Sequence, residues 1–226
     1  MKLFRAMLVL TLVCGQAAAA DLSSLSKNEM VGGLKETLTR SASTAVGLLG
    51  QEGGFLNNEK VKIPLPENLA KVEKVMRTFG MGKRADELVV AMNRAAEAAV
   101  PEAKNLLVDA VKKMSVDDAR AIITGGDDAA TAYFRKNTEG ALSDKFLPIV
   151  KKNTEKIGLA QRYNDLADKA SRFGLPDKGQ SNIETYVTRQ ALDGLYKTIA
   201  EQERLIRQDP IGQGSKRIGR IFGFAR

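Results

Sequence analysis

Apolar side chains recur at intervals of three and four residues along most of this chain. In residues 26–49 the positions that keep this interval carry Val31, Leu34, Leu38, Ala42, Ala45 and Leu49. Residues at such intervals share one face of a helix. Ser26, with Glu29 three residues later, can cap the helix start, and Gly50 follows the last apolar residue. The pattern therefore predicts an amphipathic helix over residues 26–49.

The same spacing returns in further segments that are separated by glycine, proline or capping residues. It predicts helices over residues 66–79, 83–114, 116–124, 129–136, 142–157, 159–173 and 183–207. Pro101 lies inside the longest of these segments, where it should bend the helix or divide it in two. No run of β-branched residues with alternating polarity persists, so a sheet is limited to a small hairpin at residues 61–65. The sequence predicts an all-α fold, a single bundle of about seven to nine helices.

Residues 50–66 interrupt the helical pattern with one long extended loop. Three glycines stand near its start, and two prolines stand near its end, in the stretch Val61-Lys62-Ile63-Pro64-Leu65-Pro66. Prolines so close together cannot lie inside a helix, because proline lacks the amide hydrogen and clashes with the preceding turn. The loop is longer than most helix connections, and Phe55 and Leu56 add apolar side chains to bury. We expect it to pack over the bundle as a strap or to cover an apolar pocket as a lid.

The first 20 residues have the three zones of a secretory signal peptide. Two basic residues precede an apolar run over residues 6–14, and Ala18-Ala19-Ala20 offers small side chains for cleavage. The apolar run is about half of the ~20 residues that a membrane-spanning helix needs. We therefore expect cleavage between Ala20 and Asp21 and export to the periplasm.

Cys14 is the single cysteine of the chain and raises an alternative, a lipoprotein signal in which an acylated cysteine anchors the protein. Such signals carry a small residue before the cysteine, where this chain has Val13. Cleavage after Ala20 is therefore favoured, and the mature chain then offers no disulfide and no thiolate chemistry. The expected organisation is a signal peptide (1–20), a helical domain (21–209) and a basic amphipathic or disordered tail (210–226).

The chain of 226 residues contains no histidine. This excludes hydrolases that depend on a histidine base or on histidine-ligated zinc, and leaves carboxylates, lysine, tyrosine and hydroxyls for acid–base chemistry. Lysine and arginine number 35 against 27 aspartates and glutamates, a net charge of +8. Because the chain is expected to be exported, the partner expected for this charge is anionic lipid or an acidic envelope protein rather than nucleic acid. In the alternative interpretation, the positive charge serves only to keep the protein soluble.

The candidate functional loop is Gly125-Gly126-Asp127-Asp128, at the start of a predicted helix. In one interpretation the two carboxylates bind a cation or act as acid and base. In the other, which we favour, one aspartate caps the helix while the glycines form the turn. Adjacent helical side chains diverge by about 100°, and the ligand spacing of a calcium loop and the lysine of a phosphate-binding loop are missing. We assign no catalytic residue, metal ligand or cofactor.

Lysines and tyrosines are the remaining candidates for acid–base chemistry: Lys35, Lys83, Lys104, Tyr133, Tyr163, Tyr186 and Tyr196. Each falls where a solvated helix face or the edge of the core explains it. Arg94 can contact an anion, but with Glu97 three residues later it fits a surface ion pair on a helix.

The C-terminal tail is a candidate surface-binding element. After Pro210 it contains no acidic residue and four basic ones. The residues that would contact a surface are Lys216, Arg217, Ile218, Arg220, Ile221 and Phe222. Its apolar residues share one face if the segment is helical, and such a segment can dock on anionic lipid. Three glycines weaken that helix, so an ordinary disordered tail, or one folded back on the bundle, is favoured.

Four stretches of the chain carry a resemblance to a known family. They are Gly54-Phe55-Leu56-Asn57, Ile63-Pro64-Leu65-Pro66, Thr124-Gly125-Gly126-Asp127-Asp128-Ala129-Ala130-Thr131, and Tyr186-Val187-Thr188-Arg189 with Ala191-Leu192-Asp193-Gly194-Leu195. In these stretches and their order the chain resembles the bacterial domain-of-unknown-function family DUF4197. The resemblance covers essentially the whole chain after the signal peptide. It implies an exported helical protein and transfers no activity and no catalytic residue.

The function that these observations favour is a non-enzymatic helical protein of the periplasm or cell envelope. It would bind a protein partner or a lipid-like or anionic ligand. The alternatives are an enzyme that uses Asp127 or Asp128 with a lysine or tyrosine, and a purely structural envelope factor. A pocket lined by apolar side chains would favour ligand binding, whereas the two aspartates facing a cleft would favour catalysis.

Overall fold

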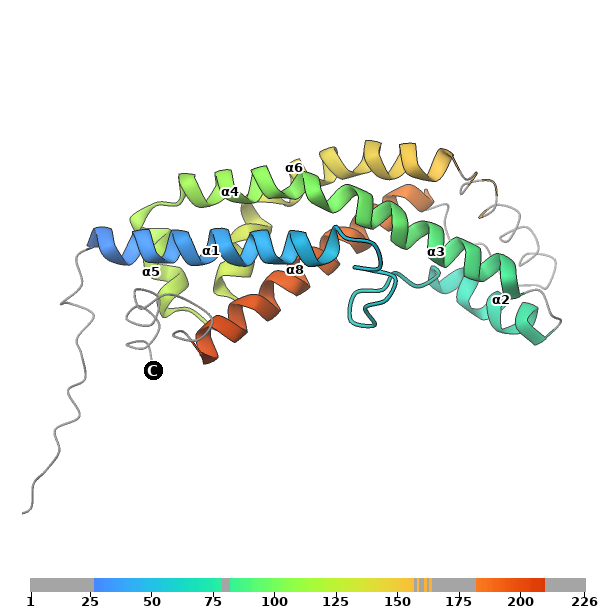
Figure 1. Ribbon diagram of the computed structural model, residues 1–226, viewed down its shortest axis with the longest axis horizontal. Helices are drawn as coiled ribbons and strands as arrows, with labels where there is room; N and C mark the ends of the chain where they lie inside the picture. Colours follow the sequence, from blue (N-terminus) through green and yellow to red (C-terminus); the bar gives the residue numbers. More distant parts are fainter. Residues whose placement is uncertain are drawn as a thin grey trace, which may run out of the picture.

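Helices form every regular element that the structure describes. The computed structural model describes residues 27–78, 82–156, 158, 161, 163 and 182–209. The elements in chain order are α1 (Lys27–Leu49), α2 (Glu67–Thr78), α3 (Gly82–Ala99), the 3₁₀ turn η2 (Val100–Glu102), α4 (Ala103–Lys113), α5 (Val116–Thr124), α6 (Ala129–Glu155) and α8 (Ile183–Gln208). The all-α prediction is therefore confirmed for these residues (Figure 1). None of their helices is long and apolar enough to cross a membrane.

Fewer separate helices are present in the described ranges than the seven to nine that the sequence predicted. Five rods of at least 12 residues form the bundle: α1, α2, α6, α8 and the continuous run of α3, η2 and α4. The nine-residue α5 lies beside them. The helices predicted at 129–136 and 142–157 are one helix, α6. The helix predicted over 159–173 lies outside the described ranges except at positions 161 and 163.

A buried face that repeats every fourth residue carries α6 across its predicted interruption. This face consists of Phe134, Thr138, Leu142, Phe146, Val150 and Thr154. Thr138 fits among apolar neighbours because its hydroxyl lies 2.7 Å from the carbonyl oxygen of Phe134 and 2.9 Å from the hydroxyl of Tyr196 on α8. Gly140 lies on the exposed face and does not interrupt the helix. A polar residue with satisfied hydrogen bonds thus takes a core position in α6.

Pro101 interrupts the third rod with a 3₁₀ turn, at the position where the sequence predicted a bend or a division. It occupies the first turn of η2, between α3 and α4. Proline is tolerated there because the first turn of a helix needs no amide donor at that position. The start of the loop after α1 packs against this ring, since a Cβ added to Gly50 would lie 3.0 Å from Pro101 Cγ. The close approach explains why a glycine follows α1.

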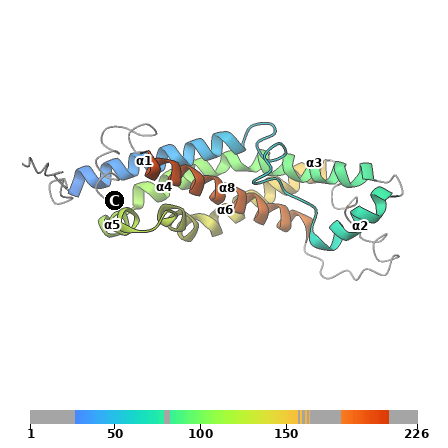
Figure 2. The same ribbon diagram turned by 90° about the horizontal axis from the view of Figure 1, so that it is seen from below.

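Helix α8 lies at the centre of the bundle and packs along both α6 and α1 (Figures 1 and 2). Helix α3 packs along α6, and α2 packs on the start of α3, at the end of the molecule opposite α5. The largest side chains with almost no exposed surface come from three regions of the sequence: Phe55 before α2, Phe134 and Phe146 on α6, and Tyr196 on α8. The core is therefore built by segments far apart in sequence.

The loop over residues 50–66, which we call the strap, packs against α8. Its side chains Phe55, Ile63 and Leu65 are buried. Phe55 lies so close to α8 that a Cβ added to Gly194 would be 2.7 Å from its ring carbon Cε1. Residues 52–57 and 59–61 form turns, so the prediction of a loop extended over residues 50–66 is wrong for that part, whereas residues 62–66 contain neither helix nor turn. The strap interpretation of this loop is confirmed.

Candidate functional site

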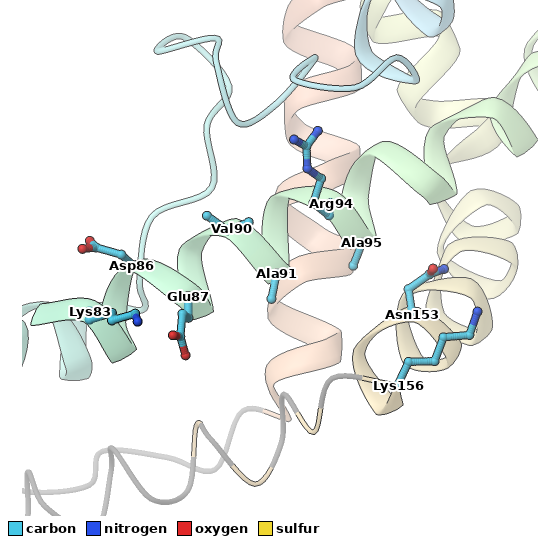
Figure 3. Close-up of a pocket in the computed structure, with 9 residues that line it drawn as sticks. All are labelled: Lys83, Asp86, Glu87, Val90, Ala91, Arg94, Ala95, Asn153 and Lys156. Carbon is cyan, nitrogen blue, oxygen red and sulfur yellow. The ribbon is translucent and has the colours of Figure 1, made fainter.

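A cavity of about 590 Å³ lies between α3 and the C-terminal end of α6. Its lining residues are Lys83, Asp86, Glu87, Val90, Ala91, Arg94, Ala95, Asn153 and Lys156 (Figure 3). Those of α3 recur every three or four residues and therefore share one face of that helix. Figure 3 shows Ala91 and Ala95 on the side of α3 that faces Asn153 and Lys156. A volume of this size is typical of small-molecule sites.

The cavity lining combines apolar side chains with charged side chains at its edge. Val90, a large apolar side chain that is 42% exposed, lines the cavity together with Ala91 and Ala95. Within the described ranges, Lys83 and Lys156 form no ion pair. Lysine stems also cover apolar surface while their ammonium groups remain in water. The arrangement suits a ligand with an apolar body and a negative charge.

The acidic side of this edge is partly neutralised within the protein. Asp86 accepts hydrogen bonds from both Nη atoms of Arg77 on α2. These hydrogen bonds lower the pKa of Asp86, with a further contribution from the positive charge of Lys62. Arg77 is shared with Glu73, whose Oε1 lies 2.8 Å from Arg77 Nε. Asp86 therefore repels an incoming anion less than a free carboxylate would.

Another face of α3 holds the strap through two buried polar side chains. Asn93, which has no exposed surface, accepts the amide N–H of Ile63 at 2.8 Å and donates to the carbonyl oxygen of Ile63 at 2.9 Å. Glu97 Oε1 accepts the amide N–H groups of Phe55 at 3.0 Å and Leu56 at 3.1 Å. The strap thus receives from side chains the backbone hydrogen bonds that a neighbouring strand would supply.

Glu97 remains a strong acceptor although it is only 4% exposed. Burial by itself raises the pKa of this carboxyl. The amide of Leu56, the guanidinium of Arg94 and the amide of Phe55 outweigh that effect, so that the pKa of Glu97 is lowered. Arg94 Nη1 lies 2.8 Å from Glu97 Oε2. The ion pair that the sequence predicted between Arg94 and Glu97 therefore forms. It is not a surface pair, because the side chain of Glu97 is buried.

Arg94 connects the cavity with the strap. Its Nη2 donates to Oε1 of Glu52, in the first turn of the strap, at 2.8 Å. Figure 3 shows the Arg94 side chain extending from α3 toward the strap, on the side away from Asn153. One side chain thus lines the cavity, pairs with a buried acid and pairs with an exposed acid of the strap.

Helix α8 holds the strap from its other side. The hydroxyl of Tyr186 donates to the carbonyl oxygen of Pro64 at 3.0 Å, and Lys197 Nζ donates to the carbonyl oxygen of Lys60 at 2.7 Å. Lys60 in turn pairs with Glu201 at 3.0 Å. These contacts attach the strap to α3 and α8 at separate points along its length.

The candidate loop at Gly125 is an exposed turn, and the helix cap predicted there is wrong. Asp127 and Asp128 are exposed, and Asp128 stands at the N-cap of α6 without a side-chain capping hydrogen bond. Glu203 of α8 takes that role, since its two oxygens accept the amide N–H groups of Ala130 and Thr131 at 2.9 Å each. Neither aspartate lines the cavity.

The two glycines of this turn differ in importance. A Cβ added to Gly125 would lie 2.6 Å from the carbonyl oxygen of Ala121 and 2.7 Å from Cβ of Ala129. At Gly126 the nearest such atom is Asp128 Oδ1, at 3.7 Å. The close packing of α5 against the start of α6 therefore requires a glycine at position 125 and tolerates a side chain at 126.

The lysine and tyrosine candidates have separate partners. Lys35 donates to the carbonyl oxygen of Lys112 at 2.9 Å, and Tyr133 donates to that of Ala110 at 2.9 Å. Tyr196 is buried against Thr138, and burial raises its pKa to about 12. Of this set only Lys83 lines the cavity. No group of three acidic, cysteine or histidine side chains in the described ranges is placed to hold a metal ion.

Other predicted features lie outside the described ranges. These are the signal peptide with Cys14 and the Ala20–Asp21 junction, and the tail residues Lys216, Arg217, Ile218, Arg220, Ile221 and Phe222. Predictions about them are not tested by the structure.

The sequence analysis missed two structurally important residues, Asn93 and Glu203, and it placed a third, Glu97, in a surface ion pair. Glu203 continues the apolar series Val187, Ala191, Leu195 and Ile199 at the next interval of four. Asn93 and Glu97 are four residues apart and next to the buried Met92 and Ala96. A polar residue at a core position of a predicted helix is the signal that marks such anchors.

Comparison with known proteins gives one match, to a protein family. Neither the curated proteins nor the solved structures searched contain a match to the chain. The family described as "Protein of unknown function (DUF4197)" matches residues 24–223, nearly the whole chain. The chain therefore belongs to the DUF4197 family.

Proposed function

We propose that this protein is a non-enzymatic binding protein of the cell envelope whose cavity between α3 and α6 holds an amphipathic anion, a molecule with an acyl-like chain and a negatively charged head. The observation that carries the proposal is the cavity itself, about 590 Å³ with Val90, Ala91 and Ala95 among its lining residues. Burial of an alkyl chain against apolar side chains contributes about 0.8 kcal/mol per CH₂ group.

The charges at the edge of the cavity support an anionic ligand. Asp86 is paired with Arg77, whereas Lys83 and Lys156 have no acidic partner among the residues that the structure describes. An anionic head would therefore gain the attraction of two lysines without first displacing an acid from either of them. Asp127 and Asp128 lie on the exposed turn before α6, away from the cavity lining, which supports binding over an acid–base role for this pair.

Titration calorimetry with dodecanoate tests the proposal. We expect wild-type protein to bind it, and to bind neutral dodecanol more weakly. Val90→Glu places a carboxylate in the cavity lining and should weaken dodecanoate binding at least about tenfold. Val116→Glu on α5 is the matched control, because the two valines are 42% and 44% exposed and Val116 is outside the cavity. Equal binding by both variants, or no binding by the wild type, would contradict the proposal.

A second pair of variants tests the charge at the edge. Lys156→Gln should weaken dodecanoate binding about threefold, the effect of removing one exposed ion pair. Lys152→Gln removes an exposed charge from the same end of α6 but outside the cavity, and should leave binding unchanged. If Lys156→Gln and Lys152→Gln weaken dodecanoate binding equally, the lysines act only through the net charge of the protein. The anionic head would then not be bound at the edge of the cavity.

The proposal includes export, which the zones of residues 1–20 support. Intact-mass measurement of protein from the periplasmic fraction should give a chain that begins at Asp21. A diacylglycerol adduct on Cys14 would instead show a lipoprotein.

The basic tail is a second proposed contact with anionic lipid. Its support is the four basic residues after Pro210, with apolar residues at helical spacing. Co-sedimentation with anionic vesicles at low salt should be weaker for a chain truncated after Asp209 than for the full chain. Equal sedimentation of both would remove the tail from the proposal.

A further inference from the structure

Arg94 belongs to two structures at once, the cavity lining and the attachment of the strap. It lines the cavity with Val90 and Ala95 on α3. Its guanidinium donates to Glu97 and Glu52, each at 2.8 Å. A guanidinium presents five N–H donors in a planar fork. Its planar shape matches a carboxylate or a phosphate.

The two acids that hold Arg94 differ sharply in exposure. The side chain of Glu97 is 6% exposed and also accepts two strap amides, so it is fixed from several directions. The side chain of Glu52 is 86% exposed, and its pairing with Arg94 is that of a surface salt bridge. Exposed pairs of this kind contribute little to stability, whereas buried and hydrogen-bonded acids are costly to leave unpaired. Glu52 is therefore the partner that a competitor can replace.

We propose that the anionic head of the cavity ligand takes the place of Glu52 on Arg94, while Glu97 keeps its bond. This inference rests on the proposed function, because it requires an anion in the cavity. Filling the cavity then releases Glu52 from α3, whereas Phe55 and Leu56 stay bound to Glu97. The rest of the strap stays attached through Asn93, which holds Ile63.

Linkage makes this coupling reciprocal. If the ligand displaces Glu52, then removing the charge of Glu52 raises the affinity of the protein for the ligand. Conversely, the ligand weakens the turn around Glu52, in which Gly54 N donates to Gln51 O at 3.0 Å. Ligand binding in the cavity thus changes the stability of the turn around Glu52 through Arg94.

Calorimetry with dodecanoate and dodecanol on charge variants tests the competition. Glu52→Gln should tighten dodecanoate about threefold, the scale of one exposed ion pair, and leave dodecanol unchanged. Glu59→Gln is the matched control, since Glu59 is a strap acid that is 87% exposed but pairs with Lys62. It should change neither affinity. Unchanged dodecanoate affinity in Glu52→Gln, or equal tightening in Glu59→Gln, would overturn the inference while leaving the proposed function intact.

Hydrogen exchange on the wild-type chain supplies an independent readout. Saturating dodecanoate should speed exchange at the amide of Gly54 and leave the amides of Phe55 and Ile63 unchanged. Dodecanoate that binds without this local change would overturn the coupling alone. If neither probe binds at all, the proposed function fails, and the coupling fails with it.

Discussion

Glu203 Oε2 on α8 accepts both the amide N–H and the hydroxyl of Thr131, each at 2.9 Å, from a residue 72 positions earlier in the chain. The other oxygen of Glu203 accepts Ala130 N at 2.9 Å and Arg207 Nη2 at 2.9 Å. The first amides of a helix have no partner inside the helix. At α6 a carboxylate from another helix supplies that partner, so a tertiary contact sets where α6 begins.

Replacement of this buried carboxylate should be strongly destabilising. We expect Glu203→Ala to lower the free energy of unfolding by about 3 kcal/mol, because it removes the acid beside the nearly buried Arg207 and leaves two amides unpaired. Glu201→Ala, which breaks the more exposed pair with Lys60, should cost less than about 1 kcal/mol. Urea denaturation of both variants makes the comparison. Similar losses in the two would show that the cap is not structural.

The exposed aspartates before α6 should contribute little to stability. Asp127→Ala and Asp128→Ala should each change the free energy of unfolding by less than about 0.5 kcal/mol, because neither caps the helix. Asp118→Ala should cost about 1 kcal/mol, since Asp118 and Ser115 form a reciprocal capping box at α5. Thermal denaturation followed by circular dichroism distinguishes the two sites. A larger loss at Asp127 or Asp128 would restore the local cap that the sequence suggested.

Acid should loosen the strap through Glu97. Because the pKa of Glu97 is lower in the folded chain than in the unfolded one, ionised Glu97 stabilises the fold above the ordinary glutamate pKa of about 4.3. That contribution is lost as the pH falls through the lower folded-state value. Glu97→Gln should therefore be about 2 kcal/mol less stable than wild type near pH 7, with a difference that narrows toward about pH 3.

Urea denaturation over that pH range measures this narrowing. Glu102→Gln is a suitable control, because Glu102 is an exposed acid at the end of η2 and should follow the wild-type curve. A difference between Glu97→Gln and wild type that stays constant with pH would show that the charge of Glu97 does not hold the strap.

The contact between the strap and α8 should tolerate no extra methyl group. In Gly194→Ala the new carbon would lie 2.7 Å from Phe55 Cε1 and 3.3 Å from Val61 Cβ, so we expect a loss of about 1–3 kcal/mol. Gly140→Ala on the exposed face of α6 has nothing within 4 Å and should stabilise the chain by about 1 kcal/mol. Opposite shifts in melting temperature are expected, and a neutral Gly194→Ala would mean that the strap can move off α8.

Helix positions were readable from the sequence wherever apolar spacing and punctuation agreed. The face of α1 contains the buried Leu34, Leu38, Ala42, Ala45 and Leu49 that the spacing predicted. Pro101 interrupts its rod because a missing amide and a fixed φ act locally. Such features depend on neighbours within a few residues, which a sequence displays directly.

Features that depend on distant partners were not readable in the same way. Thr138 looked like part of an interruption, but the hydroxyl of Tyr196 makes it a core residue of α6. Asp128 looked like a cap, but Glu203 performs that role from α8. The cavity was also invisible, because it forms only where α3 passes the end of α6. In each case the deciding atom comes from another element.

Asn93 also protects the chain against aggregation by strand addition. An extended segment with unpaired amide and carbonyl groups is a template on which another chain can add a strand. In the strap, both backbone groups of Ile63 are taken by one amide side chain, while Pro64 and Pro66 have no amide hydrogen to offer. The stretch over residues 62–66 can therefore lie without a neighbouring strand and still not become a nucleus for intermolecular β-structure.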